Sequence, residues 1–311
     1  MSDRIRISIV IPCFNGAKWL SETVQSIFSQ TFKQWECIIV NDGSIDNSFS
    51  LIKKYSEADN RIKYIDKKNE GIAIARNEAI SMSQGEYILA LDADDIIAPT
   101  YIEKAIEHFD KHPNTKIVYC QADFFGSVNK HWELPAYKYC EFIYNNCIFC
   151  SAIYRREDYN RTRGYNSNMK AIFEDWDFFL SMLNENDEVY CIPETLFFYR
   201  QHENSRTDMS PETVAEARLQ IILNHPEIYR KDIKKTAQWI GNTEQVVRLS
   251  RKKEKYHNLF VIFLVLGILL TCIVFVVCVF FYRQTPTTSG HSYGNTSPKP
   301  LRRLNLPVSR F

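Results

Sequence analysis

The sequence predicts an α/β fold with a mainly parallel central sheet and helices on both of its faces. Over residues 1–115, short runs rich in β-branched and aromatic residues alternate with segments of helical periodicity. Alternating strands and helices form parallel sheets, because each helix carries the chain back to the start of the next strand. The composition, 45% hydrophobic and 24% charged, is that of a folded domain.

Four strands are expected in this first part, and each ends in polar or turn-forming residues. They cover residues 6–12 (RISIVIP), 35–42 (WECIIVND), 61–67 (RIKYIDK) and 86–92 (EYILALD). Apolar residues recur at helical spacing in residues 17–30 and 99–112. Ligands bind parallel sheets beyond the carboxyl ends of the strands, so a site is expected at these polar strand ends.

Beyond residue 115 the regular alternation of strand-like and helix-like segments is no longer seen. Residues 116–207 contain strand-like runs at 116–125 and 188–199 and are expected to form the second half of the same domain. Residues 208–257 are mostly helical in pattern and basic. Residues 283–311 are rich in Gly, Ser, Thr and Pro, which predicts a disordered tail.

Residues 258–282 are predicted to form a transmembrane helix. Residues 259–282 carry no charge and exceed the ~20 residues that a span requires, whereas a buried core helix of this length would be unusual. Four basic residues precede the segment at 251–255, and Arg283 alone follows it closely. Cytosolic flanks carry the excess of Lys and Arg, so residues 1–257 are expected in the cytosol and the tail on the opposite side.

The net charge and the cysteine content argue against a nucleic-acid-binding protein, a disulfide-rich protein and a zinc protein. The net charge of +1 gives no field that favours nucleic acid, and no nucleic-acid partner is expected. The nine cysteines are scattered, which does not suit a disulfide framework. Cys147 and Cys150 lack a second pair or a nearby His to complete a zinc site, so free thiols in reducing, cytosolic surroundings are expected.

Polar side chains follow the first two expected strands, which end at Pro12-Cys13-Phe14-Asn15 and at Asn41-Asp42-Gly43-Ser44. Asp42 could accept hydrogen bonds from a base or a ribose hydroxyl. Ordinary strand-to-helix turns use the same residue types, and for either motif alone this structural explanation is the better one.

The fourth expected strand leads into three carboxylates within four residues, Asp92, Asp94 and Asp95. Three carboxylates this close in sequence are expected to repel one another unless a cation is bound. Oxygen-rich sites of this kind suit Mg²⁺ or Mn²⁺, which also take phosphate oxygens as ligands, so a nucleoside diphosphate is a natural partner. The alternative is a helix N-cap before Pro99, a role that Asp95 alone could fill.

Two later motifs offer further functional groups. The run Glu174-Asp175-Trp176-Asp177 could place a proton-accepting carboxylate at the same cleft, or it could simply begin a helix. Arg200 and His202, at the end of the last strand-like run, can contact phosphate or metal, although such a pair is more often structural.

Together these motifs resemble family 2 of the glycosyltransferases with the GT-A fold. The matching blocks stand in the family's order within residues 5–207: SIVIPCFN (8–15), IIVNDGSIDNS (38–48), EGIAIARNEAI (70–80), GEYILALDADD (85–95), EDWD (174–177) and YRQHENS (199–205). The resemblance implies a nucleotide-sugar-binding half over residues 1–115 and an acceptor-binding half over residues 116–207. It also implies inverting transfer of a sugar to a hydroxyl of a glycan or lipid-linked glycan.

The resemblance implies roles for individual residues as well. Asp175 would be the catalytic base, with Glu174 and Asp177 as alternatives. Asp94 would bind the Mg²⁺ or Mn²⁺ ion, with help from His202. The nucleotide would lie against six further positions: Pro12, Phe14, Asn15, Asp42, Arg76 and Asp92.

A carboxylate of ordinary pKa is ionised at neutral pH, so Asp175 is expected to act as a base without a large pKa shift. Two other functions compete with this reading. A sugar nucleotidyltransferase should carry a Gly-rich loop after the first strand, where this chain has only Gly16. A membrane-anchored, glycosyltransferase-like binding protein without turnover would be favoured by lost carboxylates, yet Asp92, Asp94, Glu174 and Asp175 are all present.

Overall fold

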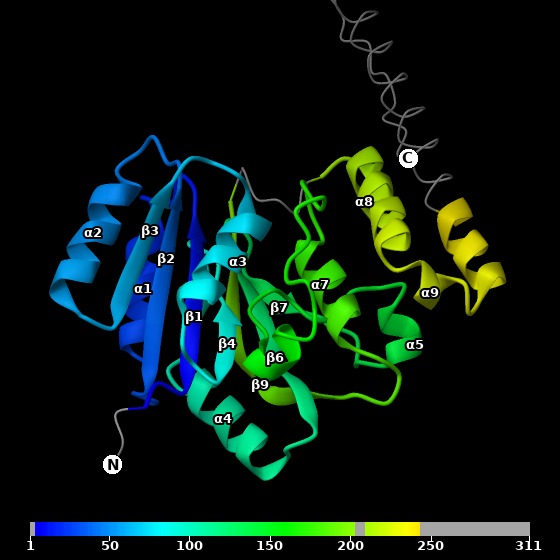
Figure 1. Ribbon diagram of the computed structural model, residues 1–311, viewed down its shortest axis with the longest axis horizontal. Coiled ribbons are helices and arrows are strands. Elements are labelled where there is room, and N and C mark those ends of the chain that lie inside the picture. Colours follow the sequence, from blue (N-terminus) through cyan, green and yellow to red (C-terminus); the bar gives the residue numbers. More distant parts are fainter. Residues whose placement is uncertain (1–3, 203–208, 243–311) are drawn as a thin grey trace, which may run out of the picture. The chain divides into compact units, whose positions relative to one another are not determined.

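The computed structural model describes residues 4–202 and 209–242, which belong to one compact unit built around a mixed sheet (Figure 1). The strand order is β3-β2-β1-β4-β8-β6-β9-β5, and β7 pairs with β6. The strands are β1 (Ile7–Cys13), β2 (Trp35–Asp42), β3 (Ile62–Lys67), β4 (Tyr87–Ala90), β5 (Ile96–Ile97), β6 (Thr115–Gly126), β7 (Lys130–Trp132), β8 (Ile153–Arg155) and β9 (Glu188–Gln201).

The helices connect these strands and cover the sheet. They are α1 (Leu20–Phe28), α2 (Ser48–Ala58), α3 (Ile72–Met82), α4 (Tyr101–Lys111), α5 (Tyr139–Phe142), α6 (Arg156–Tyr159), α7 (Glu174–Met182), α8 (Pro211–Asn224) and α9 (Pro226–Tyr229). The sequence predicts helices within residues 17–30 and 99–112, and the structure has both, as α1 and α4.

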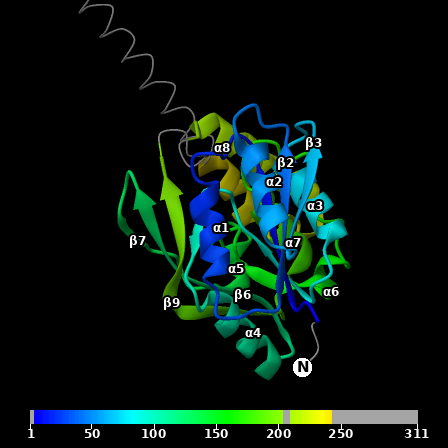
Figure 2. The same cartoon turned by 90° about the vertical axis from the view of Figure 1, so that its left-hand side faces the viewer.

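The first half of the sheet is parallel, as predicted. β3, β2, β1 and β4 pair in parallel, with Val10 of β1 opposite Ile38 of β2 and Ala90 of β4. The residues of β2 and β4 are buried throughout, because helices cover both faces. In Figures 1 and 2, α1 and α2 lie on one side of these strands and α3 on the other, the arrangement that right-handed crossovers produce when the strand order reverses.

The second half of the sheet corrects the prediction of a mainly parallel sheet. β8 runs antiparallel to both β4 and β6, and β9 pairs parallel with β6 but antiparallel with β5. For one further antiparallel pair the reason lies in the connection. β6 turns directly into β7 through a short loop, and a short loop without a long crossover can join only antiparallel strands.

The last described residues are helical, as predicted for the start of the segment 208–257. α8 begins where the Ser210 hydroxyl accepts a hydrogen bond from the Thr213 N–H, with Pro211 in the first turn. Among the described residues, no helix combines the length and apolar character needed to cross a membrane. The expected span 258–282 and the tail 283–311 lie outside the described residues. The cysteines that are described are free, as expected.

Candidate active site

The loop that follows β1 is fastened to the loop that follows β2. Asn15, which has a left-handed backbone with φ of 52°, donates its N–H to the Ser44 hydroxyl over 3.0 Å, and its side-chain oxygen accepts from the Ile45 N–H over 2.9 Å. Pro12 lies within β1, and the Phe14 side chain beyond it is 55% exposed. These contacts hold both loops at one edge of the sheet and leave the Phe14 ring accessible. Their contact with a nucleotide stays a prediction.

Asp42, at the end of β2, is buried and holds the start of α3. Its two carboxylate oxygens accept hydrogen bonds from the Glu70 and Gly71 N–H groups, over 3.0 and 2.9 Å. Each oxygen has a further lone pair that a ligand could use. Base binding by Asp42 therefore stays a prediction, but the residue also has a structural role that the sequence did not reveal.

Arg76 lies between two carboxylates, and its expected contact with the nucleotide stays a prediction. Its side chain is fully buried, and its guanidinium donates to Asp92 over 2.7 Å and to Glu174 over 3.0 Å. Burial alone would lower the pKa of Arg76, but the carboxylates of Asp92 and Glu174 raise it above its usual range. Arg76 thus links the end of β4 to the start of α7.

Asp92-Ala93-Asp94, the D-x-D motif, follows the end of β4 and lies beside the end of β9. His202 Nε2 lies 3.1 Å from an oxygen of Asp94, so the structure brings together the two residues expected at the metal. Burial and the neighbouring Asp92 raise the pKa of Asp94, while His202 partly offsets this. A divalent cation would relieve that repulsion, and the hard oxygens of Asp92 and Asp94 are the donors that Mg²⁺ and Mn²⁺ prefer. The residues present therefore fit a metal of this class.

Asp95 and Arg200 stabilise this arrangement rather than face a ligand. The buried Asp95 accepts the backbone N–H of Arg200 over 2.8 Å, and the Arg200 side chain donates to the Asp94 carbonyl and to Glu22. Asp95 is not a helix cap, because α4 begins later, at Tyr101. Arg200 positions the backbone of Asp94, and its expected contact with phosphate stays a prediction.

The Cys150 side chain, a protonated thiol, also contacts the Asp92 carboxylate. Its Sγ donates to an Asp92 oxygen over 3.6 Å, and burial raises its pKa well above the usual range. Asp92, Asp95 and Cys150 lie close enough to hold an ion together, but a protonated thiol is a poor metal ligand. The expected metal site therefore stays at Asp94 and His202 and does not include Cys150.

Asp175 lies in the first turn of α7, and a residue with left-handed backbone, Phe173, precedes the helix with φ of 67°. One oxygen of Asp175 accepts the Trp176 N–H over 2.8 Å. Burial and the charge of Glu174 raise the pKa of Asp175 to about 7, against the expectation of an ordinary value, although Arg76 acts in the opposite direction. A carboxylate that titrates near neutral pH is well matched to the role of general base.

The two alternative bases have other partners. Glu174 forms the buried ion pair with Arg76. Asp177 lies on another face of α7, where one oxygen accepts from Asn224 over 2.7 Å and lies 3.0 Å from His225 Nε2. Asp177 therefore connects α7 to the region of α8 and α9, and it does not line the cavity that contains Asp175.

One cavity of about 330 Å³ joins the end of β4 to the start of α7. Asp92, Glu174 and Asp175 line it, together with aromatic and aliphatic side chains that the sequence did not single out: Trp132, Leu134, Ile148, Phe149, Ile172, Phe173, Tyr199, Met209 and Val214. A mostly apolar wall with a few converging carboxylates is the usual composition of a ligand site.

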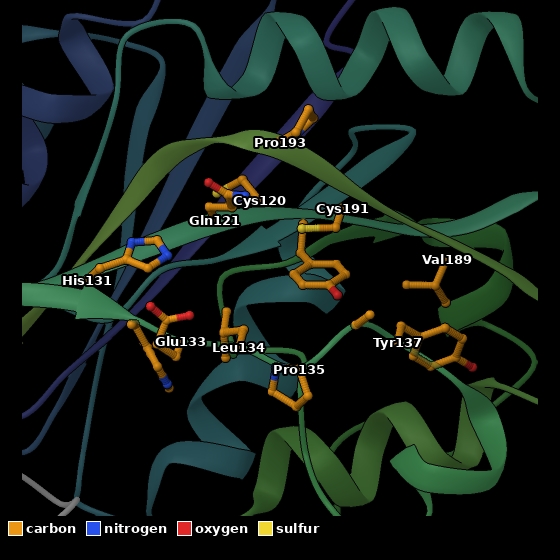
Figure 3. A pocket seen from close by; sticks show the side chains of 13 residues that line it. Cys120, Gln121, His131, Glu133, Leu134, Pro135, Tyr137, Val189, Cys191 and Pro193 are labelled. Carbon is orange, nitrogen blue, oxygen red and sulfur yellow. The ribbon is translucent and has the colours of Figure 1, made fainter.

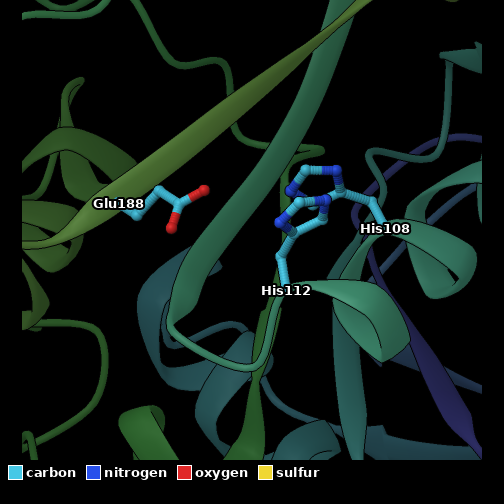
Figure 4. Close-up of side chains that lie close together, drawn as sticks. All are labelled: His108, His112 and Glu188. Carbon is cyan, nitrogen blue, oxygen red and sulfur yellow. The ribbon is translucent and has the colours of Figure 1, made fainter.

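None of a second group of side chains with ligand atoms, His108, His112 and Glu188, lines this cavity. Figure 4 shows the three side chains. The two imidazoles stack with ring centres 4.3 Å apart and planes 18° apart, and His108 also stacks on Tyr190 at 3.8 Å. A metal binds in the plane of an imidazole, and two stacked rings share no such plane. The group therefore acts here as an aromatic contact between α4 and β9.

A parallel β-α-β half that ends in a D-x-D motif, joined to a mixed half that carries Asp175, defines an α/β domain of the GT-A type. The chain belongs to glycosyl transferase family 2, whose model matches residues 8–202. These residues form a glycosyltransferase domain, as the sequence motifs predicted.

Related sequences agree with this assignment. The chain is 30% identical over 210 residues to glycosyltransferase GlyA of Streptococcus pneumoniae, a match that covers 62% of this chain and 29% of the relative. It is 29% identical over 213 residues to the glycosyltransferase EpsE of Bacillus subtilis, named as putative, covering 66% of this chain and 76% of the relative. The chain thus spans less than a third of the pneumococcal protein.

Solved structures share the fold. S. aureus TarS residues 1–349 align with a TM-score of 0.58 and 21% identity, over 78% of this chain and 69% of the other. The mannosyltransferase PcManGT of Pyrobaculum calidifontis, solved with GDP-Man and Mn²⁺, aligns with a TM-score of 0.57 and 15% identity, over 80% and 76% of the two chains. At these identities the likeness concerns the fold alone.

Proposed function

We propose that this chain is an inverting glycosyltransferase that moves a sugar from a nucleoside-diphosphate donor to a hydroxyl of a glycan or lipid-linked glycan. The observation that carries the proposal is that the D-x-D residue Asp92 and the base candidate Asp175 line one cavity of about 330 Å³. Structures with the same fold support a nucleotide-sugar donor, since TarS was solved with UDP-GlcNAc and PcManGT with GDP-Man.

The two ends of the cavity have different roles in this reaction. Asp94, with His202 beside it, would hold a Mg²⁺ or Mn²⁺ ion, which when bound supplies charge neutralisation for the leaving nucleoside diphosphate. Asp92 is held by Arg76 at the donor end. Asp175 accepts the proton of the acceptor hydroxyl. A single displacement from the face opposite the leaving group inverts the anomeric carbon, and no residue needs to become a covalent nucleophile.

Neither alternative function is favoured by the family membership. A nucleotidyltransferase needs no base near an acceptor hydroxyl, whereas the Asp175 carboxyl lines the cavity, and burial beside Glu174 raises its pKa. A binding protein without turnover would not require Asp92 and Asp175 to line the same cavity.

The metal requirement is tested by donor hydrolysis, in which water replaces the acceptor. The full chain is assayed with a panel of nucleotide sugars that includes UDP-GlcNAc and GDP-mannose. We expect hydrolysis with Mg²⁺ or Mn²⁺ and a loss of at least about a hundredfold in EDTA, because several kcal/mol of charge stabilisation disappear. Asp94→Asn should resemble the chelated enzyme. The matched change Asp110→Asn, in an exposed ion pair with Arg6, should not. Full activity in EDTA would refute the metal role.

We further propose that residues 258–282 anchor the chain in a membrane with residues 1–257 in the cytosol, on the basis of the uncharged segment 259–282 and the basic residues before it. A reporter fused after Phe311 should be accessible only from the non-cytosolic side. The same reporter placed before Met1 should be cytosolic, and a cytosolic signal from both fusions would contradict the orientation.

A further inference from the structure

A second cavity, of about 400 Å³, lies between β6, β9 and the segment formed by residues 130–137 (Figure 3). Its volume is within the range of roughly 300–1,000 Å³ that is typical of ligand sites. The residues that line it come from these three segments: Tyr119, Cys120, Gln121, His131, Trp132, Glu133, Leu134, Pro135, Ala136, Tyr137, Val189, Cys191 and Pro193. Nothing in the reaction described above uses this cavity.

The second cavity adjoins the active-site cavity, because Trp132 and Leu134 line both. The Trp132 ring stacks on Phe124 with centres 4.7 Å apart and packs at 5.4 Å from Tyr199, which itself lines the active-site cavity. These contacts fix the ring in one orientation. Trp132 and Leu134 thus lie where the two cavities meet, and a molecule that passes along them would contact both cavities.

The chemistry of the second cavity suits a neutral molecule with many hydroxyl groups. Gln121, His131 and Glu133 are exposed and lie on one side of it in Figure 3, whereas Tyr137 and Val189 lie on the other. Amide and imidazole groups both donate to and accept from hydroxyls, and a carboxylate accepts from them. Aromatic rings offer flat apolar surface to the carbon-bound hydrogens of a sugar ring.

The described residues that line the two cavities include no Lys or Arg. Phosphate and carboxylate groups are usually recognised by these cations. The lining therefore disfavours a polyphosphate or an acidic polymer in the second cavity and favours an uncharged oligosaccharide.

We propose that the second cavity is a binding subsite for an oligosaccharide acceptor, whose reacting unit lies at Asp175 and whose next units pass Trp132 and Leu134 to reach Gln121 and Glu133. The inference rests on the proposed function, because it identifies the class of the acceptor. It adds that the acceptor contains more than one sugar unit and is uncharged where it meets this subsite.

The test measures binding of the full chain to an array of neutral monosaccharides and di- to hexasaccharides. We expect capture by an oligosaccharide and not by its constituent monosaccharides. Gln121→Ala and Glu133→Ala should each weaken that binding about tenfold, as expected for the loss of a polar contact in a cavity. The matched variants Gln25→Ala and Glu57→Ala, at exposed positions of α1 and α2, should bind like the wild type.

Donor hydrolysis by the same wild-type preparation separates the two proposals. Oligosaccharide capture without any donor hydrolysis would contradict the proposed function and leave the subsite supported as a glycan-binding site. Donor hydrolysis without capture of any oligosaccharide would overturn the subsite alone. Binding that is unchanged in both Gln121→Ala and Glu133→Ala would also overturn it.

Discussion

Asp175→Asn is expected to lower the turnover of the donor by about a hundred- to ten-thousandfold, the usual contribution of a general base. Asparagine has nearly the same shape and can still accept the Trp176 N–H, so α7 should begin as before. Donor affinity should change little, because a base acts on the proton of the acceptor. The measurement is kcat and KM for nucleotide-sugar hydrolysis, together with nucleotide binding by calorimetry.

Asp177→Asn is the matched control on the same helix. Asp177 contacts Asn224 and His225 in a buried position, so its substitution should lower the unfolding temperature and spare the turnover of the folded protein. The assignment of the base is wrong if Asp177→Asn or Glu174→Gln abolishes turnover while Asp175→Asn does not.

The pH dependence of the wild type provides an independent readout of the same group. A general base must be ionised, and the pKa of Asp175 is raised to about 7. The value of kcat/KM should therefore be low in acid, rise as the pH passes through about 7 and then level off. A profile that is already flat from about pH 5 upward would indicate a base with an ordinary carboxylate pKa.

The parallel half of the fold could be predicted from the sequence because its signal is local. Strands β2 and β4 are buried throughout, β1 is buried at all but one residue, and turn-forming residues follow these strands. Strand β2 forms over the predicted residues 35–42. The mixed half could not be predicted in the same way. β8 is only three residues long and takes its place from long-range pairing with β4 and β6, which leaves no periodicity in the sequence.

The candidate site likewise contains residues that the sequence motifs indicate and contacts that only the packed structure brings together. Asp92 and Asp94 could be singled out as candidates because they directly follow strand β4 in the sequence. Asp175 could be singled out because residues 174–177 resemble a block of the family. The pairing of Arg76 with Glu174 joins residues 98 positions apart, and the cavity wall at Trp132 and Tyr199 is assembled from two separate strands. The sequence also does not indicate the raised pKa of Asp175, because this shift depends on burial that only the packed structure defines.

Arg76→Met is expected to destabilise the protein by about 3–5 kcal/mol, the usual effect of breaking a buried ion pair from one side. The substitution leaves Asp92 and Glu174 without their shared cation in a region that also contains Asp175. The free energy of unfolding in urea measures this effect. The same change at Arg6, whose partners Glu86 and Asp110 keep 38% and 52% of their side-chain surface exposed, should cost about 0–1 kcal/mol.

A double substitution distinguishes charge from packing. Glu174→Gln removes one of the two carboxylates that Arg76 neutralises, so Arg76→Met combined with Glu174→Gln should be more stable than Arg76→Met alone. A coupling free energy between the two sites would confirm that they interact directly. Strictly additive losses would instead assign the effect of Arg76→Met to packing against Tyr165, whose ring centre lies 5.2 Å from the guanidinium.

Arg76 also influences the chemistry of the site through Asp175. The positive charge of Arg76 lowers the pKa of Asp175, against the larger effects of burial and Glu174, which raise it. Without Arg76 the pKa of Asp175 should move above about 7, so the rise of kcat/KM should shift to higher pH and the activity at neutral pH should fall. Adding Glu174→Gln removes a negative charge beside Asp175 and should move the profile back toward acid. A purely structural residue would lower activity at every pH by the same factor, and the direction of these two shifts therefore tests whether Arg76 sets the protonation of the base.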